Sequence, residues 1–139
     1  MDVKEAIESR RAWRSLVPVS LERETIEELA RCASLAASCY NKQPWKYDFA
    51  AGGEKLDEMR GALAKGNEWA QKASMIIAVH SKVEDDCLVA GREYFLFDTG
   101  MATAHLILRA VELGLVAHPI AGYDEERVKE ILGLGEEET

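Results

Sequence analysis

The sequence predicts a sheet with helices on both of its faces. Three observations support this fold class. Segments with helical spacing of apolar residues alternate with short apolar runs bounded by turn residues, which is typical of helices and buried strands that follow one another. Residues 92–114 carry apolar side chains around most of their circumference, which predicts a long helix inside the core. The length of 139 residues suits one domain, which we expect to span residues 1–139.

The N-terminal part of the chain predicts two helices. Residues 2–11 repeat apolar residues four positions apart, which is typical of a short amphipathic helix. Ser20 is the expected N-cap of the second helix, because apolar residues recur at helical spacing from Ile26 to Ala37 and acidic residues occupy the first turn. This second helix leads directly into the polar segment 38–41.

The remaining elements follow from short apolar runs and from glycine signals. The predicted strands are at 45–51, 74–79 and 115–120, and the predicted helices are at 54–65, at 92–114 and between Asp124 and Gly133. Gly114 and Gly133 are expected to end the helices that precede them. Three predicted strands are too few to fix the order of the strands in the sheet.

The helix predicted at 92–114 has only a narrow polar stripe, formed by Asp98, His105, Arg109 and Glu112. We therefore expect this helix to be nearly buried, either in the centre of the core or in the centre of a dimer. Charged and titratable side chains interrupt the segment, which argues against a helix that spans a membrane. His105 is expected to be a structural histidine rather than a catalyst.

The composition narrows the classes of partner and compartment. A formal net charge of -8 and a pI near 4.9 oppose nucleic acid or an anionic membrane as the main partner, because such binding is driven by basic surface. Cys32, Cys39 and Cys87 are odd in number and lack metal-ligand spacing, so we expect neither a disulfide framework nor a zinc site. The charged N-terminal residues do not form a signal peptide, and a cytoplasmic setting is expected.

The segment SLAASCYNKQPW at 34–45 is the first candidate for a ligand site. A helix ends there in amide and hydroxyl groups, and Asn41 and Gln43 offer donors and acceptors that suit the edge of a planar heterocycle. Pro44 stiffens the turn that presents these groups. The alternative is an ordinary polar helix stop followed by a strand.

Two further segments are also candidates, and each has a plainer alternative. Arg10, Arg11 and Arg14 would form a clamp for phosphate in an otherwise acidic chain, or they simply follow the preference of basic residues for a helix C-terminus. Residues 119–122, Pro-Ile-Ala-Gly, would let backbone N–H groups approach a flat ring closely, or they are only a turn.

The sequence offers no constellation of catalytic side chains. It contains no Ser-His-Asp order, no glycine-rich phosphate loop and no obvious carboxylate pair. We therefore expect the chemistry to come from a bound cofactor, with no catalytic residue and no metal ligand supplied by the protein.

Five segments, taken in order, resemble the FMN-dependent nitroreductase family. They are S-R-R-A-W-R at 9–14, A-S-C-Y-N-K-Q-P-W at 37–45, G-N-E-W at 66–69, D-T-G-M-A at 98–102 and G-L-V-A-H-P-I-A-G-Y-D at 114–124. The resemblance covers nearly the whole chain. It implies an α+β fold with a mixed, mainly antiparallel sheet, a long buried central helix, and an intertwined homodimer with FMN sites at the interface.

By position, the resemblance also assigns cofactor contacts to particular residues. Arg10, Arg11 and Arg14 would hold the phosphate and ribityl end or the pyrimidine edge. Ser38, Cys39 and Asn41 would approach the flavin from the partner subunit, with Gln43 supporting their loop. The remaining expected contacts are Asn67 near the pyrimidine side and Pro119, Ile120, Ala121 and Gly122 along the ring edge near N5.

The chain departs from the family pattern in four places. Ala12 stands where many members have serine, Ala37 replaces a usual proline, and Ala121 is often glutamate in one branch. Members usually continue past the last helix into another apolar strand and a basic residue that helps to bind the phosphate, whereas this sequence ends Gly-Leu-Gly-Glu-Glu-Glu-Thr. We therefore expect the domain to lack that strand.

The resemblance implies an FMN-dependent oxidoreductase. Such an enzyme passes hydride from NAD(P)H through the flavin to nitroaromatic, quinone or similar acceptors by a ping-pong mechanism. Two alternatives stay open. One is an FMN-binding protein without turnover, which the short C-terminus suggests, and the other is a different flavin enzyme of the superfamily, such as a reductive dehalogenase or a flavin-fragmenting enzyme.

Overall fold

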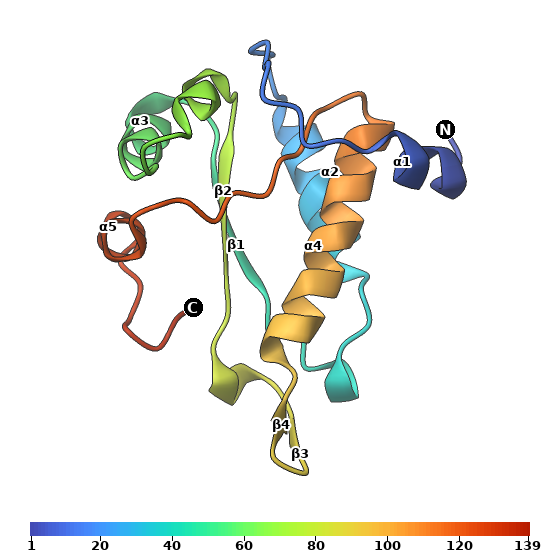
Figure 1. Ribbon diagram of the computed structural model, residues 1–139. Coiled ribbons are helices and arrows are strands. Elements are labelled where there is room, and N and C mark those ends of the chain that lie inside the picture. The colour runs from blue at the N-terminus through green and yellow to red at the C-terminus, as the bar shows by residue number, and fades with distance from the viewer.

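The longest helix, α4 (Phe95–Glu112), packs along α2 (Arg23–Ser34) at the centre of the fold in the computed structural model, which describes residues 1–139 (Figure 1). The buried cluster between the two helices consists mainly of alanine and leucine, including Leu29, Ala33 and Leu106. A shorter helix, α1 (Val3–Ser9), contacts α4, and its N-terminus is capped by a reciprocal pair of hydrogen bonds between Asp2 and Glu5.

The central strands lie between two groups of helices. β1 (Lys46–Ala50) and β2 (Ile76–His80) pair antiparallel, with Lys46 opposite His80 and Ala50 opposite Ile76. α2 and α4 cover one side of the pair, and α3 (Gly53–Gly61) and α5 (Glu125–Leu132) lie on the other side (Figure 1). The prediction of a sheet with helices on both faces is therefore confirmed.

Short elements connect these layers. Three 3-10 turns are present: η1 (Cys39–Asn41), η2 (Glu68–Lys72) and η3 (Val83–Asp85). The strands β3 (Leu88–Val89) and β4 (Arg92–Glu93) form a small antiparallel hairpin immediately before α4. The sequence did not predict this hairpin, because two-residue strands leave no alternating apolar pattern. None of the helices combines the length and the apolar character needed to cross a membrane.

The predicted strand at 115–120 is wrong. No backbone hydrogen bond to another backbone group involves residues 116–121, and the nearest pairing is an isolated bridge between Leu63 and Tyr123. The segment has the composition of a strand, but an extended segment becomes one only when a neighbour supplies the ladder of hydrogen bonds.

Two predicted helix features also need correction. Ser20 is not the N-cap of α2: the helix begins at Arg23 after Glu22, and the Ser20 hydroxyl donates to the Glu22 side chain instead. Asp98 does not belong to a solvated stripe, because it is buried in the first turn of α4. Within one chain α4 is only partly buried, since Leu96 is 56% exposed and Phe97 is 65% exposed, and its burial in a dimer stays a prediction.

Candidate functional site

Three aromatic or basic side chains from separate segments stack on one another. The Arg14 guanidinium lies 5.8 Å from the centre of the Trp69 ring, and the Trp69 and His118 ring centres are 4.3 Å apart. One ring nitrogen of His118, Nδ1, lies 3.2 Å from the Trp13 carbonyl oxygen. This Arg14–Trp69–His118 stack joins the N-terminal basic segment, η2 and the segment after α4.

Asn67 fixes the end of the segment 119–122 beside this stack. Its Nδ2 donates to the Gly122 carbonyl oxygen at 2.7 Å, and the Ala64 backbone N–H donates to the same oxygen at 3.0 Å. A Cβ atom at position 122 would lie 2.7 Å from Asn67 Nδ2. A Cβ at position 122 would therefore displace the Asn67 amide, so glycine at this position preserves the Asn67–Gly122 hydrogen bond.

The arginines of the N-terminal segment have no acidic partner. Arg10, Arg11 and Arg14 make no ion pair, and Arg11 donates only to the backbone carbonyls of Glu8 and Arg10. Five of the six other arginines pair with carboxylates, namely Arg23, Arg31, Arg60, Arg109 and Arg127, whereas Arg92 makes no ion pair. Free guanidinium groups in a chain of net charge -8 are suited to an exogenous anion.

The loop 38–43 is shaped by its own hydrogen bonds. The Gln43 backbone N–H donates to the Ser38 hydroxyl at 2.9 Å, and the Gln43 side chain donates to the Ser34 carbonyl at 3.1 Å. The Cys39 backbone N–H donates to Asp98 Oδ2 at 2.6 Å. The Asn41 side chain is exposed and makes no hydrogen bond, so its amide is free to contact a ligand.

Cys39 and Cys87 form a disulfide, which overturns the expectation that the cysteines are unpaired. The two residues are 48 positions apart in the sequence, and their Cα atoms lie 6.0 Å apart. Sequence spacing could not reveal this pair, because the start of α4 brings the loop after α2 beside the segment before β3. Cys32 stays a free thiol, and burial raises its pKa above the ordinary value.

The predicted site residues fall into two groups that lie toward opposite ends of α4 (Figure 1). The loop 38–43 bonds to Asp98 in the first turn of the helix, whereas the segment 115–122 follows its last turn. α4 has 18 residues and is therefore about 27 Å long. One chain thus brings Arg14, Asn67 and residues 119–122 together, but not the loop 38–43 with them.

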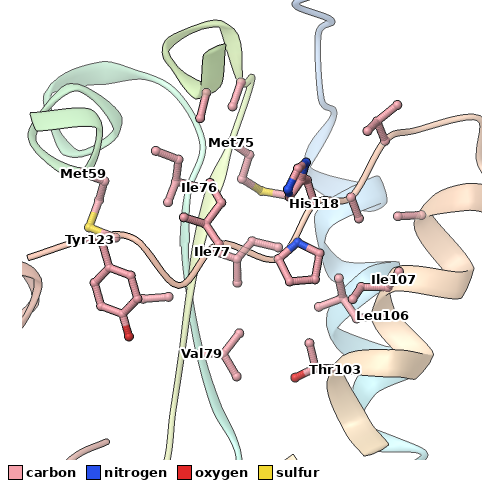
Figure 2. Close-up of a pocket in the computed structure, with 18 of the residues that line it drawn as sticks. Met59, Met75, Ile76, Ile77, Val79, Thr103, Leu106, Ile107, His118 and Tyr123 are labelled. Carbon is pink, nitrogen blue, oxygen red and sulfur yellow. The ribbon is translucent and has the colours of Figure 1, made fainter. Parts of the chain in front are cut away.

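A large cavity of about 880 Å³ opens between β2, α4 and the segment 115–120. Figure 2 shows Ile76, Ile77 and Val79 on one side of this cavity and Leu106 and Ile107 on the other. Its lining is mostly apolar. Among the predicted cofactor residues only Pro119 and Ile120 reach it, so the predicted contacts lie mainly outside the cavity.

The sequence pattern did not reveal the contacts of three further side chains. Trp69 belongs to the G-N-E-W segment, and its position two residues after Asn67 was the available signal. His118 precedes Pro119 and contacts Trp69, and His80 lies within hydrogen-bonding distance of two carboxylates. Neither histidine has an obvious partner in its local sequence.

Comparison with known proteins places the chain in a family. Residues 7–68 and 49–139 match the model of the nitroreductase family, and the chain belongs to this family. The solved structure of a nitroreductase family protein from Clostridium novyi NT superposes with a TM-score of 0.89 at 24% identity, covering 99% of this chain and 79% of that one. The α+β, nitroreductase-like fold class is therefore confirmed.

Other relatives extend this assignment. An uncharacterized 15.4 kDa protein of Mycolicibacterium smegmatis is 40% identical over 77 residues, which are 55% of this chain and about half, 51%, of that protein. The Bacillus subtilis protein YdgI, which carries the name of an NAD(P)H nitroreductase, is 28% identical over 176 aligned residues, covering 98% of this chain and 82% of YdgI. An oxidoreductase solved with FMN has a TM-score of 0.86 at 25% identity, covering 97% of this chain and 71% of that one.

Proposed function

We propose that this protein is an FMN-dependent oxidoreductase that uses NAD(P)H as electron donor. The observation that carries the proposal is the set of three arginines without acidic partners, of which Arg14 lies over the Trp69 ring beside the segment that Asn67 and Gly122 hold in place. The nitroreductase family assignment and the FMN in a solved relative support the same cofactor.

The N-terminal arginines bind the phosphate end of FMN. Arg10, Arg11 and Arg14 hold the FMN phosphate and ribityl chain through charge-assisted hydrogen bonds, which are about twice as strong as neutral ones. The stack of Arg14 on Trp69 limits where the Arg14 guanidinium can go. This restriction lowers the entropy that binding must remove.

The second part of the site supplies the ring contacts. Pro119, Ile120, Ala121 and Gly122 lie along the ring edge, held in place by the Asn67–Gly122 hydrogen bond. Asn67 keeps its Oδ1 free of other hydrogen bonds and offers it as an acceptor to the pyrimidine side. These residues orient the cofactor and do not transfer protons.

A second copy of the chain completes the site. Ser38, Cys39 and Asn41 approach the flavin from the partner subunit, with Gln43 bracing their loop, because one chain holds the two groups toward opposite ends of α4. The exposed Leu96 and Phe97 on α4 supply apolar surface for such a homodimer.

Bound FMN would accept hydride from NAD(P)H and pass the electrons to a nitroaromatic, quinone or similar small acceptor in a ping-pong cycle. The protein then contributes binding, orientation and electrostatics rather than an acid or a base. No side chain of this chain is therefore assigned a catalytic role.

The test is the visible absorption spectrum of the purified protein with added FMN, followed by anaerobic addition of NADH or NADPH. We expect a bound flavin spectrum that bleaches on addition of the nucleotide and recovers on addition of a quinone or nitroaromatic acceptor. Flavin that binds but stays oxidised with both nucleotides would favour the binding protein without turnover. Absence of binding would overturn the proposal.

A further inference from the structure

The disulfide between Cys39 and Cys87 joins the two segments that carry strained backbone. The non-glycine residues with positive φ are Tyr40 at 48°, Asn41 at 56°, Gln43 at 51° and Ala90 at 52°. The first three lie in the loop 38–43, and Ala90 lies in the turn between β3 and β4, three residues after Cys87. Such conformations persist only where the surrounding structure enforces them.

Few contacts enforce the conformation of the loop 38–43. Its only hydrogen bond to a distant part of the chain runs from the Cys39 backbone N–H to Asp98 Oδ2 at 2.6 Å. The other hydrogen bonds of the loop stay within residues 34–43. The disulfide is therefore the one covalent cross-link between this loop and a segment that is distant in the sequence.

The surroundings of the disulfide suit a slow switch rather than a rapidly cycling catalyst. The carboxylate of Asp86 lies close to both sulfur atoms, and Asp98 binds the Cys39 backbone. Negative charge near a thiol disfavours the thiolate, and the thiolate is the form that attacks or leaves in exchange.

We propose that the Cys39–Cys87 disulfide is a reversible redox clamp on the loop 38–43. A dithiol reductant opens the clamp: its two thiols are oxidised to a disulfide, while the sulfur–sulfur bond of the protein breaks and takes up two electrons and two protons to give two cysteine thiols. The strained loop then loses its covalent tie. In a reducing compartment the clamp would be open unless an oxidant of the disulfide or peroxide class closes it.

Opening of the clamp would also affect FMN binding, and this part of the inference rests on the proposed function. The loop 38–43 is the part of the chain that we assign to the cofactor site of the partner subunit. A loop that samples many conformations binds less tightly, because binding must then order it. Opening the clamp is therefore expected to weaken FMN binding.

Hydrogen exchange measured by mass spectrometry, with and without dithiothreitol, tests the clamp itself. Three proteins are compared: the unaltered protein, Cys87→Ser, which cannot form the disulfide, and Cys32→Ser, which keeps it. We expect dithiothreitol to speed amide exchange in residues 38–43 by about tenfold in the unaltered protein and in Cys32→Ser. Cys87→Ser should exchange rapidly with or without the reductant.

Two results would overturn the proposal. One is a peptide map without reductant that lacks the Cys39–Cys87 cross-link. The other is unchanged exchange in residues 38–43 after alkylation has shown that both thiols were freed. If Cys87→Ser fails to fold, the comparison of Cys32→Ser with and without dithiothreitol decides alone.

The FMN dissociation constant of Cys32→Ser, measured before and after reduction, is a separate readout. We expect it to rise about tenfold on reduction. If neither form binds FMN, the proposed function fails while the exchange data still decide on the clamp. If FMN binds equally well to both forms, the link between clamp and cofactor is refuted.

Discussion

At the level of single residues, Arg10, Arg11 and Arg14 make no ion pair, a property that only Arg92 shares among the other arginines. Each stays free of a carboxylate in a chain where acidic residues outnumber basic ones by 25 to 17. Pairing with Asp or Glu would make these guanidinium groups unavailable to a phosphate, because the carboxylate would first have to be displaced. Their isolation is therefore consistent with an anion site.

Replacing Arg10 with alanine should weaken FMN binding. Loss of one charge-assisted hydrogen bond costs about 1.5–3 kcal/mol, which corresponds to a dissociation constant raised about 10- to 150-fold. Titration of the protein with FMN, followed by flavin fluorescence, measures the change. Arg23→Ala removes the same charge from an exposed position on α2 and should leave the affinity unaltered. Equal affinities for Arg10→Ala and the unaltered protein would contradict the phosphate assignment.

The residues that sequence reasoning could not place share one physical property. The Cys39–Cys87 disulfide, the contact of Trp69 with His118 and the bond from Cys39 to Asp98 all join positions that are far apart in the chain. Local spacing carries information on neighbours within a turn or a strand, but not on which loops meet. The family resemblance had named the segments that hold all of these residues except Cys87, but it did not say which side chains in those segments would meet.

At the level of elements, the end of β2 is held by a network of charged groups. Lys46 Nζ lies 2.6 Å from Glu138 Oε1 and 2.8 Å from Asp85 Oδ2, and His80 lies between Glu138 and Asp48 at 2.7 and 2.9 Å. Thr139 exchanges two backbone hydrogen bonds with Ser81 next to this network. The segment 133–139 is thereby fastened across the end of β2.

Stability should depend on pH through Glu138. Burial alone would raise the pKa of its carboxyl, but the hydrogen bonds from Lys46 and His80 together outweigh burial and hold the pKa below the ordinary value of 4.5. A lowered pKa in the folded state contributes stability that is fully present above pH 4.5 and is lost as the pH falls through the folded pKa.

Glu138→Gln tests this linkage by urea unfolding at pH 7 and at pH 3. The substitution should lower the free energy of unfolding at pH 7 by about 1–3 kcal/mol, because it removes the charge that Lys46 and His80 face. The difference from the unaltered protein should shrink at pH 3. Glu136→Gln, an exposed change in the same segment, should have little effect at either pH. A deficit of equal size at both values would show that the charge of Glu138 does not matter.

The helices and strands also show which parts of the fold a local sequence pattern can predict. Helices could be predicted because their hydrogen bonds and their apolar spacing are both local: α2, α4 and α5 lie within or close to the predicted ranges. Strands β1 and β2 lie in or close to the predicted ranges 45–51 and 74–79, and each has the other as partner. The segment 115–120 is a short apolar run like β2 but has no such partner, and the local sequence alone cannot distinguish these two cases.

At the level of the whole molecule, the two groups of proposed cofactor residues lie toward opposite ends of α4, so they would meet only across two chains. The resemblance implied this arrangement, and the separation along α4 gives it a geometric reason. In a two-fold symmetric dimer, each of two sites would contain the arginines of one chain and the loop 38–43 of the other. The exposed apolar side chains of α4, Leu96 and Phe97, are the surface that such a dimer would cover.

This arrangement predicts complementation between two defective variants. R10A lacks the phosphate contact and N41A lacks the loop contact, and each is expected to bind FMN weakly when it is alone. In a mixed dimer, the arginines of the N41A chain meet the loop of the R10A chain, so one of the two sites is intact. After unfolding and refolding of an equal mixture, about a quarter of all sites should bind FMN with the affinity of the unaltered protein.

A mixture of R10A with R14A is the matched control, because both changes lie in the same half of the site. In that mixture every site retains one defective arginine, so no tight binding should return. Recovery in the R10A and N41A mixture alone would establish that the two halves come from different chains. If that mixture binds no better than its components while sedimentation shows that mixed dimers have formed, then Arg10 and Asn41 do not meet across the interface, and the loop 38–43 must be removed from the cofactor site.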